Sequence, residues 1–231
     1  MNKHRKTFVL TADDFGISPR ANKNILALVK AKKIDRVSLM VHGAFTPQEL
    51  EKLRQSGVKI DLHLENDPKK KHRQGIKEGA FLRGVLFSLK LLSRQMRSGF
   101  VSLYWEQQID QFHALLGRYP DGLNSHQHIH YFPPYFHLLT KLAQKKEISF
   151  IRFGKVALIP SNTSVYRILF WLHKKDRPTF LASHLQSTDH LVSLDWIKDL
   201  PIFLSQEPSG SLEIVCHPER KHELELIQKY F

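Results

Sequence analysis

The sequence predicts an α/β fold built from parallel β/α units. Short apolar segments rich in β-branched residues alternate along the chain with segments whose apolar residues recur at helical spacing, an alternation typical of parallel sheets. Polar residues able to do chemistry also follow several predicted strands, where α/β folds place their functional groups. At 231 residues the chain fits one α/β domain with a sizeable core, so we expect a single domain over residues 1–231.

The first unit combines a strand over residues 7–11, the turn Asp13-Asp14-Phe15-Gly16, and a helix that Ser18 caps and Pro19 opens. The later strands are short apolar runs, and the helices are amphipathic segments that end at glycines such as Gly57. We expect these strands over residues 37–41, 58–64, 149–153, 180–183 and 212–217, and these helices over residues 47–55, 81–96, 105–116, 135–144, 165–173 and 221–229.

The stretch Ser125-His126-Gln127-His128-Ile129-His130 is the most unusual in the chain. If it is extended, the three imidazoles point to one face, because side chains two apart in a strand share a face. The apolar Ile129 and the following prolines suggest the end of a buried strand, where imidazoles commonly bind a metal. The alternative is that these are solvated histidines or ordinary core histidines.

Other segments supply partners for such a metal. Asp13 and Asp14, His63, and His126 with His128 each come at or after a predicted strand. One carboxylate and two imidazoles form a common catalytic metal set that leaves positions for water and substrate. A second carboxylate beside them can act as a general base. Standing alone, the Asp-Asp pair would be better explained as a turn followed by a helix cap.

Composition narrows the class of protein. With 42% hydrophobic and 25% charged residues the chain is an ordinary globular one, and its single cysteine excludes an intrachain disulfide framework. No signal peptide and no membrane-spanning run is visible, so we expect a cytoplasmic, soluble protein, at most in peripheral contact with the inner membrane surface. The net charge of +13 implies attraction to an anionic partner such as nucleic acid, a phosphorylated substrate or a membrane.

Two basic segments bear on that partner. Residues 67–73 form a charged loop with Pro68, which we interpret as a solvated surface or as the rim of an anion site. Residues 81–96 combine leucines at helical spacing with Arg83, Lys90 and Arg94. This segment is expected to pack on the core or form a lid, and membrane contact is the alternative.

Five pieces of the sequence, taken in order, resemble a known family, the YdjC-like carbohydrate deacetylases, which include chitooligosaccharide deacetylases and a hopanoid-associated deacetylase. They are Thr11-Ala12-Asp13-Asp14-Phe15-Gly16, Leu62-His63-Leu64, Asn124-Ser125-His126-Gln127-His128-Ile129-His130, Ile151-Arg152 and Glu213-Ile214-Val215-Cys216-His217-Pro218. Each piece alone is weak, but the ordered set spans nearly the whole chain and is specific.

The resemblance implies an irregular (β/α) barrel, TIM-barrel-like, that removes the N-acetyl group from an acetamido sugar; incomplete closure of the barrel is left open. By this resemblance Asp14, His63 and His126 are metal ligands, Asp13 is the base, His217 is the acid, Arg152 orients Asp13, and His128, His130 and Phe15 lie at the substrate or in the second layer of the site. The implied cofactor is one divalent metal ion, Mg²⁺ in the family; the ligand types would also suit Zn²⁺ or Co²⁺.

The expected partner is an N-acetylated sugar, with a phosphate or a lipid attached as an option that the charge suggests. No nucleic acid is expected, and a homodimer is left open.

The chain departs from the family at Asp61, where glycine is usual, at Glu65-Asn66, and at Glu219-Arg220 after His217-Pro218. These differences bear on substrate identity and barrel closure. Two other functions remain in view, a metal-dependent phosphoesterase and a non-enzymatic binder of anionic polymers.

Overall fold

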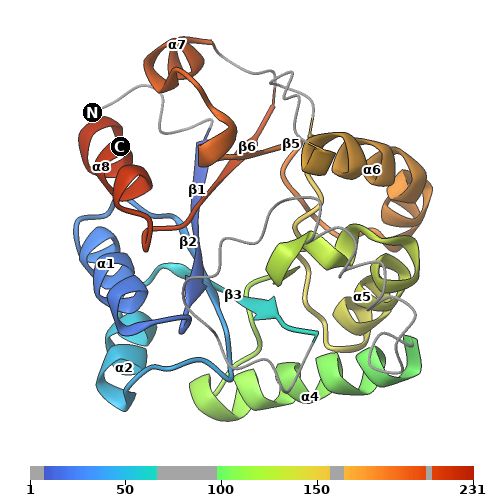
Figure 1. The fold of residues 1–231 in the computed structure, drawn as a ribbon. Coiled ribbons are helices and arrows are strands. Elements are labelled where there is room, and N and C mark those ends of the chain that lie inside the picture. The colour runs from blue at the N-terminus through green and yellow to red at the C-terminus, as the bar shows by residue number, and fades with distance from the viewer. Residues whose placement is uncertain (1–7, 67–97, 157–163, 207–209) are drawn as a thin grey trace.

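The structure is a computed structural model that describes residues 8–66, 98–156, 164–206 and 210–231 (Figure 1). Its strands are β1 (Phe8–Phe15), β2 (Arg36–Leu39), β3 (Lys59–Leu64), β4 (Leu123–Ser125), β5 (His190–Ser193) and β6 (Leu212–Cys216). Its α-helices are α1 (Pro19–Lys30), α2 (Pro47–Gln55), α4 (Ser98–Leu116), α5 (Pro133–Lys145), α6 (Ser164–Ser183), α7 (Leu200–Ser205) and α8 (Lys221–Tyr230). Two 3₁₀ helices, η3 (His126–Tyr131) and η4 (Leu194–Trp196), follow β4 and β5.

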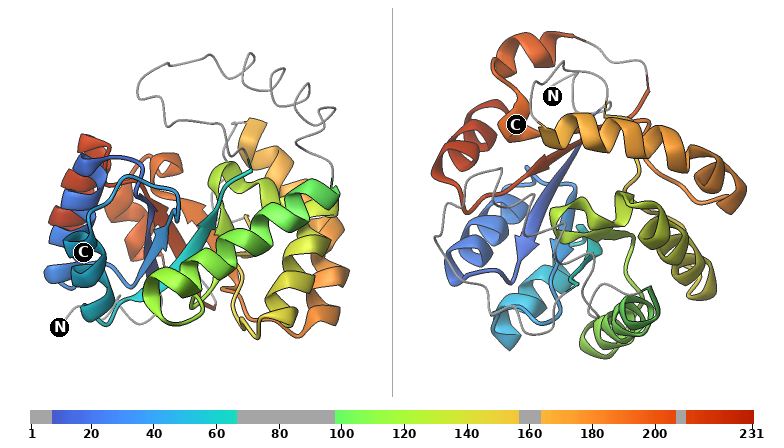
Figure 2. Two further views of the ribbon diagram at one scale, coloured as in Figure 1. Left: turned by 90° about the horizontal axis from the view of Figure 1, so that it is seen from below. Right: turned by 45° about the vertical axis from the view of Figure 1, so that its right-hand side comes forward.

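The strands form one parallel sheet in the order β4-β3-β2-β1-β6-β5. The sheet curls on itself, and the helices surround it on the outside (Figures 1 and 2). Because all paired strands are parallel, their carboxyl ends meet at one rim, which in such folds carries the functional groups. The prediction of parallel β/α units is confirmed.

The gap between β4 and β5 is spanned by an irregular segment, residues 149–155. Single bridges join Ile151 to Leu123 of β4 and Lys155 to His190 of β5. The amide of Arg152 also donates to the carbonyl of Leu123 at 3.0 Å. No continuous ladder forms on either side of this segment. The architecture is therefore the expected irregular (β/α) barrel, and its closure, which the sequence left open, is incomplete.

Local signals place the first helices where the sequence predicts them. The Ser18 hydroxyl accepts a hydrogen bond from the Ala21 amide, and Pro19 opens α1. Helix α2 begins with a full capping box, in which Thr46 and Glu49 satisfy each other's backbone amides. Both helices therefore start at the residues expected from their caps.

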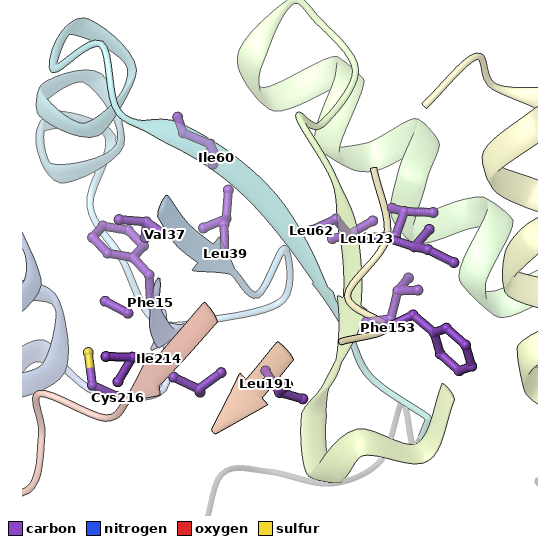
Figure 3. Close-up of a cluster of buried hydrophobic side chains, with 14 of the residues drawn as sticks. Phe15, Val37, Leu39, Ile60, Leu62, Leu123, Phe153, Leu191, Ile214 and Cys216 are labelled. Atoms are coloured by element: carbon purple, nitrogen blue, oxygen red, sulfur yellow. The ribbon is translucent and has the colours of Figure 1, made fainter. Parts of the chain in front are cut away.

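The apolar core lies between the outer face of the sheet and the helices (Figure 3). Strand residues such as Val37, Leu39, Ile60 and Leu62 are completely buried there. The largest fully buried side chains outside the strands include those of Trp105, Phe112, Phe136 and Phe153. With apolar residues on this face, the opposite face of the sheet is left for polar groups.

Several predicted elements were wrong. Residues 126–130 are not extended, because β4 ends at Ser125 and a 3₁₀ turn follows, with Gln127 and His128 at positive φ. Residues 180–183 are the last turn of α6 rather than a strand, since the helix continues through Pro178 and Phe180 packs on Phe153. Residues 149–153 pair only through isolated bridges.

Strand β5 and helix α7 were not predicted at all. Conversely, the predicted helix over residues 81–96 and the basic loop over residues 67–73 lie outside the described residues. Among the helices that the structure describes, none has the length and hydrophobicity to cross a membrane.

Candidate active site

One set of polar side chains lines the inner face of the barrel. Residues paired across parallel strands point to the same side of the sheet, and the strand registers align Ser38 with Asp61, and His63 with Asn124. Further buried polar residues on this face of the strands are Thr11, Asp13, Ser193 and Glu213. A buried polar interior of this kind requires internal partners for each charge.

An irregularity in β1 brings two neighbouring carboxylates into this interior. The register of β1 against β2 shifts between Ala12 and Phe15, and Asp14 adopts a left-handed backbone with φ of 68°. In a regular strand Asp13 and Asp14 would point to opposite faces. The bulge instead lets both carboxylates contact side chains inside the barrel. Residues 13–15, which were predicted to form a turn, are part of strand β1.

Asp14, His63 and His126 converge although they come from β1, β3 and the turn after β4. Asp14 Oδ1 lies 3.3 Å from His63 Nε2 and 3.1 Å from His126 Nδ1. One ligand atom from each residue lies within 4.8 Å of the other two. Ligands that share a cation at about 2 Å are themselves about 3 to 3.5 Å apart, so the three residues fit a divalent metal ion.

The other nitrogen of His63 is fixed by Asn124. His63 Nδ1 contacts Asn124 Oδ1, which as an amide oxygen can only accept, so Nδ1 carries the proton. This arrangement leaves Nε2 facing Asp14, where it can bind a cation once it carries no proton. An imidazole held in this way is the usual arrangement of a metal ligand.

Asn124 also connects His63 with Asp13. Its Nδ2 donates to Ser38 Oγ at 2.9 Å, and the Ser38 hydroxyl donates to Asp13 Oδ1 at 2.6 Å. The four buried side chains therefore form one continuous hydrogen-bonded chain. Asp13 stands at one end of it and His63 at the other.

Arg152 binds Asp13 with two parallel hydrogen bonds. Its two terminal nitrogens donate to Asp13 Oδ2 at 2.7 Å and Oδ1 at 2.8 Å, and its Nε donates to Glu213 Oε1 at 2.9 Å. Burial alone would raise the pKa of Asp13, but the guanidinium holds it well below its ordinary value. Asp13 is therefore a carboxylate at neutral pH, and the structure brings it and Arg152 together as predicted.

His217 lies just beyond β6, at the same rim. Its amide donates to Glu223 Oε2 at 2.7 Å, and its Nδ1 is 3.5 Å from that oxygen. Burial opposes protonation, but Glu223, Asp14 and Asp13 outweigh it, so the pKa of His217 is raised above its ordinary value. His217 therefore keeps its proton to a higher pH than an ordinary histidine does.

The remaining residues of the histidine stretch have different surroundings. His130 is fully buried and bonded at both nitrogens, to Ser125 Oγ at 2.7 Å and to the Arg152 carbonyl at 2.9 Å, which ties the turn to the segment beside it. His128 Nδ1 is buried without a hydrogen-bond partner among the described residues. Burial lowers the pKa of His128 to about 3, so this ring is neutral.

Phe15 was predicted at the substrate or in the second layer of the site. It instead belongs to the apolar core, where its ring lies 6.1 Å from that of Phe45 (Figure 3). The outward direction follows from the bulge, which turns Asp14 inward and lets Phe15 resume the outer face.

Four residues of the network had no predicted role: Ser38, Asn124, Glu213 and Glu223. Asn124 and Glu213 stood inside the motif pieces but were given no function there. Ser38 carried a signal, as the one hydroxyl in an apolar strand sequence. Glu223 lies in a charged helix and offered no such signal.

A model of the family described as YdjC-like protein matches residues 7–229. The chain belongs to the YdjC-like family. Human carbohydrate deacetylase is 31% identical to this YdjC-like protein over 160 residues, covering 66% of the chain and 50% of the human protein. The chain therefore spans about half the length of that relative.

A bacterial relative is covered more fully. The chitooligosaccharide deacetylase of Escherichia fergusonii is 22% identical over 227 residues, which are 92% of this YdjC-like protein and 81% of the relative. A crystal structure from Enterococcus faecalis, of a candidate cellobiose-phosphate cleavage protein, superimposes with a TM-score of 0.59 at 19% identity. It covers 91% of this chain and 80% of the other, and supports the barrel-like fold alone.

Proposed function

We propose that this YdjC-like protein is a metal-dependent N-deacetylase of acetamido sugars. The observation that carries the proposal is the convergence of Asp14, His63 and His126 beside the ionised Asp13. The names of the relatives, carbohydrate deacetylase and chitooligosaccharide deacetylase, support the reaction and the class of substrate. An attached phosphate or lipid on the sugar remains part of the proposal on the strength of the net charge of +13.

Asp14, His63 and His126 would hold the divalent cation in this proposal. A bound cation supplies Lewis acidity, which polarises the acetyl carbonyl and lowers the pKa of the attacking water. Two imidazoles and one carboxylate suit Zn²⁺ or Co²⁺, whereas the family resemblance implies Mg²⁺. Elemental analysis of protein purified without added metal distinguishes these ions.

Asp13 would accept the proton of the attacking water. Arg152 and Ser38 donate three hydrogen bonds to it, which fix its orientation and keep it ionised. Those same bonds weaken its basicity, because they favour the charged carboxylate. Asp13 therefore suits the transfer of a proton from a water that is already acidified.

His217 would donate a proton to the departing amine. An amine is a poor leaving group until it is protonated, so amide hydrolysis needs an acid on that side. The raised pKa of His217 keeps the imidazolium available to a higher pH than in an ordinary histidine. His128, a neutral ring, would contact the substrate.

The direct test is acetate release from a panel of N-acetylated sugars. The purified chain is incubated with Mg²⁺, Zn²⁺ or Co²⁺ and with chitooligosaccharides, phosphorylated N-acetylhexosamines and N-acetylated glycolipids. The proposal expects acetate and free amine in equal amounts, lost in Asp14→Asn. Silence across the panel from protein that binds metal stoichiometrically would refute it.

A phosphoesterase is less compatible with this site. Such enzymes commonly use two metal ions with bridging ligands, and Asp13 would be the nearest carboxylate for a second ion. Both of its oxygens are already engaged by Arg152 and Ser38. Release of phosphate from the phosphorylated sugars of the panel would favour a phosphoesterase over a deacetylase. Steeply salt-dependent binding to an anionic polymer, without bound metal, would favour the non-enzymatic binder.

A further inference from the structure

Helix α6 lies on the outside of the barrel (Figure 1) and exposes large apolar side chains. Its inner side is formed by Leu169, Leu172 and Asp176, all buried. The exposed apolar residues are Ile168 (48%), Phe170 (43%), Trp171 (58%) and Leu181 (58%). Single exposed apolar residues are ordinary on a protein surface, but four on one helix form a patch that needs an explanation.

The same helix face carries positive charge and no negative charge. Arg167, Lys174, Lys175 and Arg177 are exposed, and the sole acidic residue of α6, Asp176, is buried on the opposite side. The Lys175 ammonium lies 5.2 Å from the centroid of the Trp171 ring. Basic and aromatic groups are thus interleaved on one surface, here called the α6 face: residues 167, 168, 170, 171, 174, 175, 177 and 181.

Two other helices, α2 and α8, carry charges of both signs, whereas α1 and α5 have basic residues and no acidic ones. On α2, Arg54 pairs with Glu51 at 2.6 Å, and on α8, Lys221 lies 3.7 Å from Glu225. Such mixed pairs are typical of a face that only contacts water. The α6 face differs from α2 and α8 because it has no exposed carboxylate, and from α1 and α5 because it exposes large apolar side chains.

The amino-terminal half of α6 lies at the rim that carries the candidate site. The Tyr166 ring contacts Trp196 edge-on, with centroids 6.4 Å apart. Trp196 belongs to η4, which directly follows the carboxyl end of β5. Ile168 and Trp171 are therefore close to the end of the barrel at which Asp14 and His217 lie.

We propose that the α6 face binds the surface of an anionic lipid bilayer. The four cations complement lipid phosphates, while Trp171 and the aliphatic side chains insert among the headgroups, as in other basic amphipathic helices at membrane interfaces. A nucleic acid would satisfy the cations, but it offers no apolar contact for Ile168 or Leu181. Binding in this way holds the rim of the barrel next to the bilayer, independently of which substrate the site accepts.

Co-sedimentation of the full chain with vesicles tests the proposal. Vesicles of phosphatidylcholine alone are compared with vesicles that also contain about 30 mol% phosphatidylglycerol, a fraction typical of strongly anionic membranes. We expect partition into the anionic vesicles to be stronger by about tenfold or more, to weaken with salt, and to shift tryptophan emission to the blue.

Two variants remove the two components separately. Ile168→Ser with Trp171→Ser removes the apolar contacts, and Lys174→Glu with Lys175→Glu reverses the charge; each should lower anionic-vesicle partition by about tenfold. The matched controls are Ile202→Ser on α7, where Ile202 is also 58% exposed, and Lys221→Glu with Lys229→Glu on α8; neither should change it. All of these side chains are exposed, and circular dichroism verifies that the variants fold.

Three results would overturn the proposal. One is the absence of sedimentation with anionic vesicles. Another is an equal loss of binding in the α7 or α8 control variants, which would indicate a diffuse effect of net charge. The third is binding to single-stranded RNA, tested with polyuridylate, under conditions where vesicles are not bound.

Discussion

Asn124 holds His63 in the tautomer that a metal ligand needs. The amide oxygen accepts from Nδ1 of the ring, while Nε2 faces Asp14 Oδ1 at 3.3 Å. Because Asn124 also donates to Ser38, the same side chain couples the proposed metal ligand to the network around Asp13. The orientation and the tautomer of His63 thus depend on Asn124, a residue that would touch neither the metal nor the substrate.

Asn124→Ala is expected to weaken metal affinity by about 10- to 100-fold, the usual effect of losing a partner behind a metal-binding histidine. Calorimetric titration with Zn²⁺ or Co²⁺ measures it. Ser38→Ala is the matched control, since it breaks the link to Asp13 and leaves the contact between His63 and Asn124 in place. Equal affinities in wild type and Asn124→Ala would contradict this role.

Removal of metal should destabilise the wild-type protein and not Asp14→Asn. A ligand that binds only the folded chain raises its stability by mass action, so a chelator should lower the melting temperature until the metal is restored. Asp14→Asn removes one of three ligands and should abolish most of that response. A chelator-induced shift of the same size in Asp14→Asn would argue against Asp14 as a ligand.

Arg152→Met should be strongly destabilising, by about 3 to 5 kcal/mol, because it leaves Asp13 and Glu213 buried without their cation. Urea unfolding measures the change. Adding Asp13→Asn to Arg152→Met should recover part of the loss, since one uncompensated charge is removed. Arg54→Met, at an exposed pair on α2, is the control and should have no measurable effect.

The pH profile of deacetylation should depend on Glu223. His217 has a raised pKa, so its protonated form is present at low pH and is lost as the pH rises through that raised value. Activity that needs His217 as an acid therefore declines on the alkaline side. Glu223→Gln removes the carboxylate that raises this pKa, and the alkaline limb of kcat should move to lower pH; an unmoved limb would assign it to another group.

Much of the fold could be predicted from local signals. The alternation of apolar runs with capped amphipathic segments predicted α1, α2 and β3, because capping and periodicity are properties of neighbouring residues. The end of α6 and the absence of a ladder at residues 149–153 depend instead on packing, as in the contact of Phe180 with Phe153. Such contacts between distant segments leave no local signature.

In the candidate site, too, the residues could be predicted from the sequence but their arrangement could not. The motif pieces contained Asp13, Asp14, His63, His126, Arg152 and His217, and the structure places them in one region. Their arrangement was not predictable, because it depends on a bulge at Asp14 and on a 3₁₀ turn that separates His126 from His128. A regular strand at residues 13 and 14 would have turned one of the two neighbouring carboxylates away from the interior.

The segment that closes the barrel between β4 and β5 also provides Arg152. Three isolated bridges connect this segment to its neighbours, and the guanidinium reaches across the interior to Asp13 on β1 and Glu213 on β6. Arg152 therefore connects this segment of the barrel to the carboxylate of the proposed base, Asp13. A substitution that weakens the ion pairs of Arg152 would destabilise this side of the barrel and also disturb the proposed base. Stability and turnover should therefore decline together in variants of this segment.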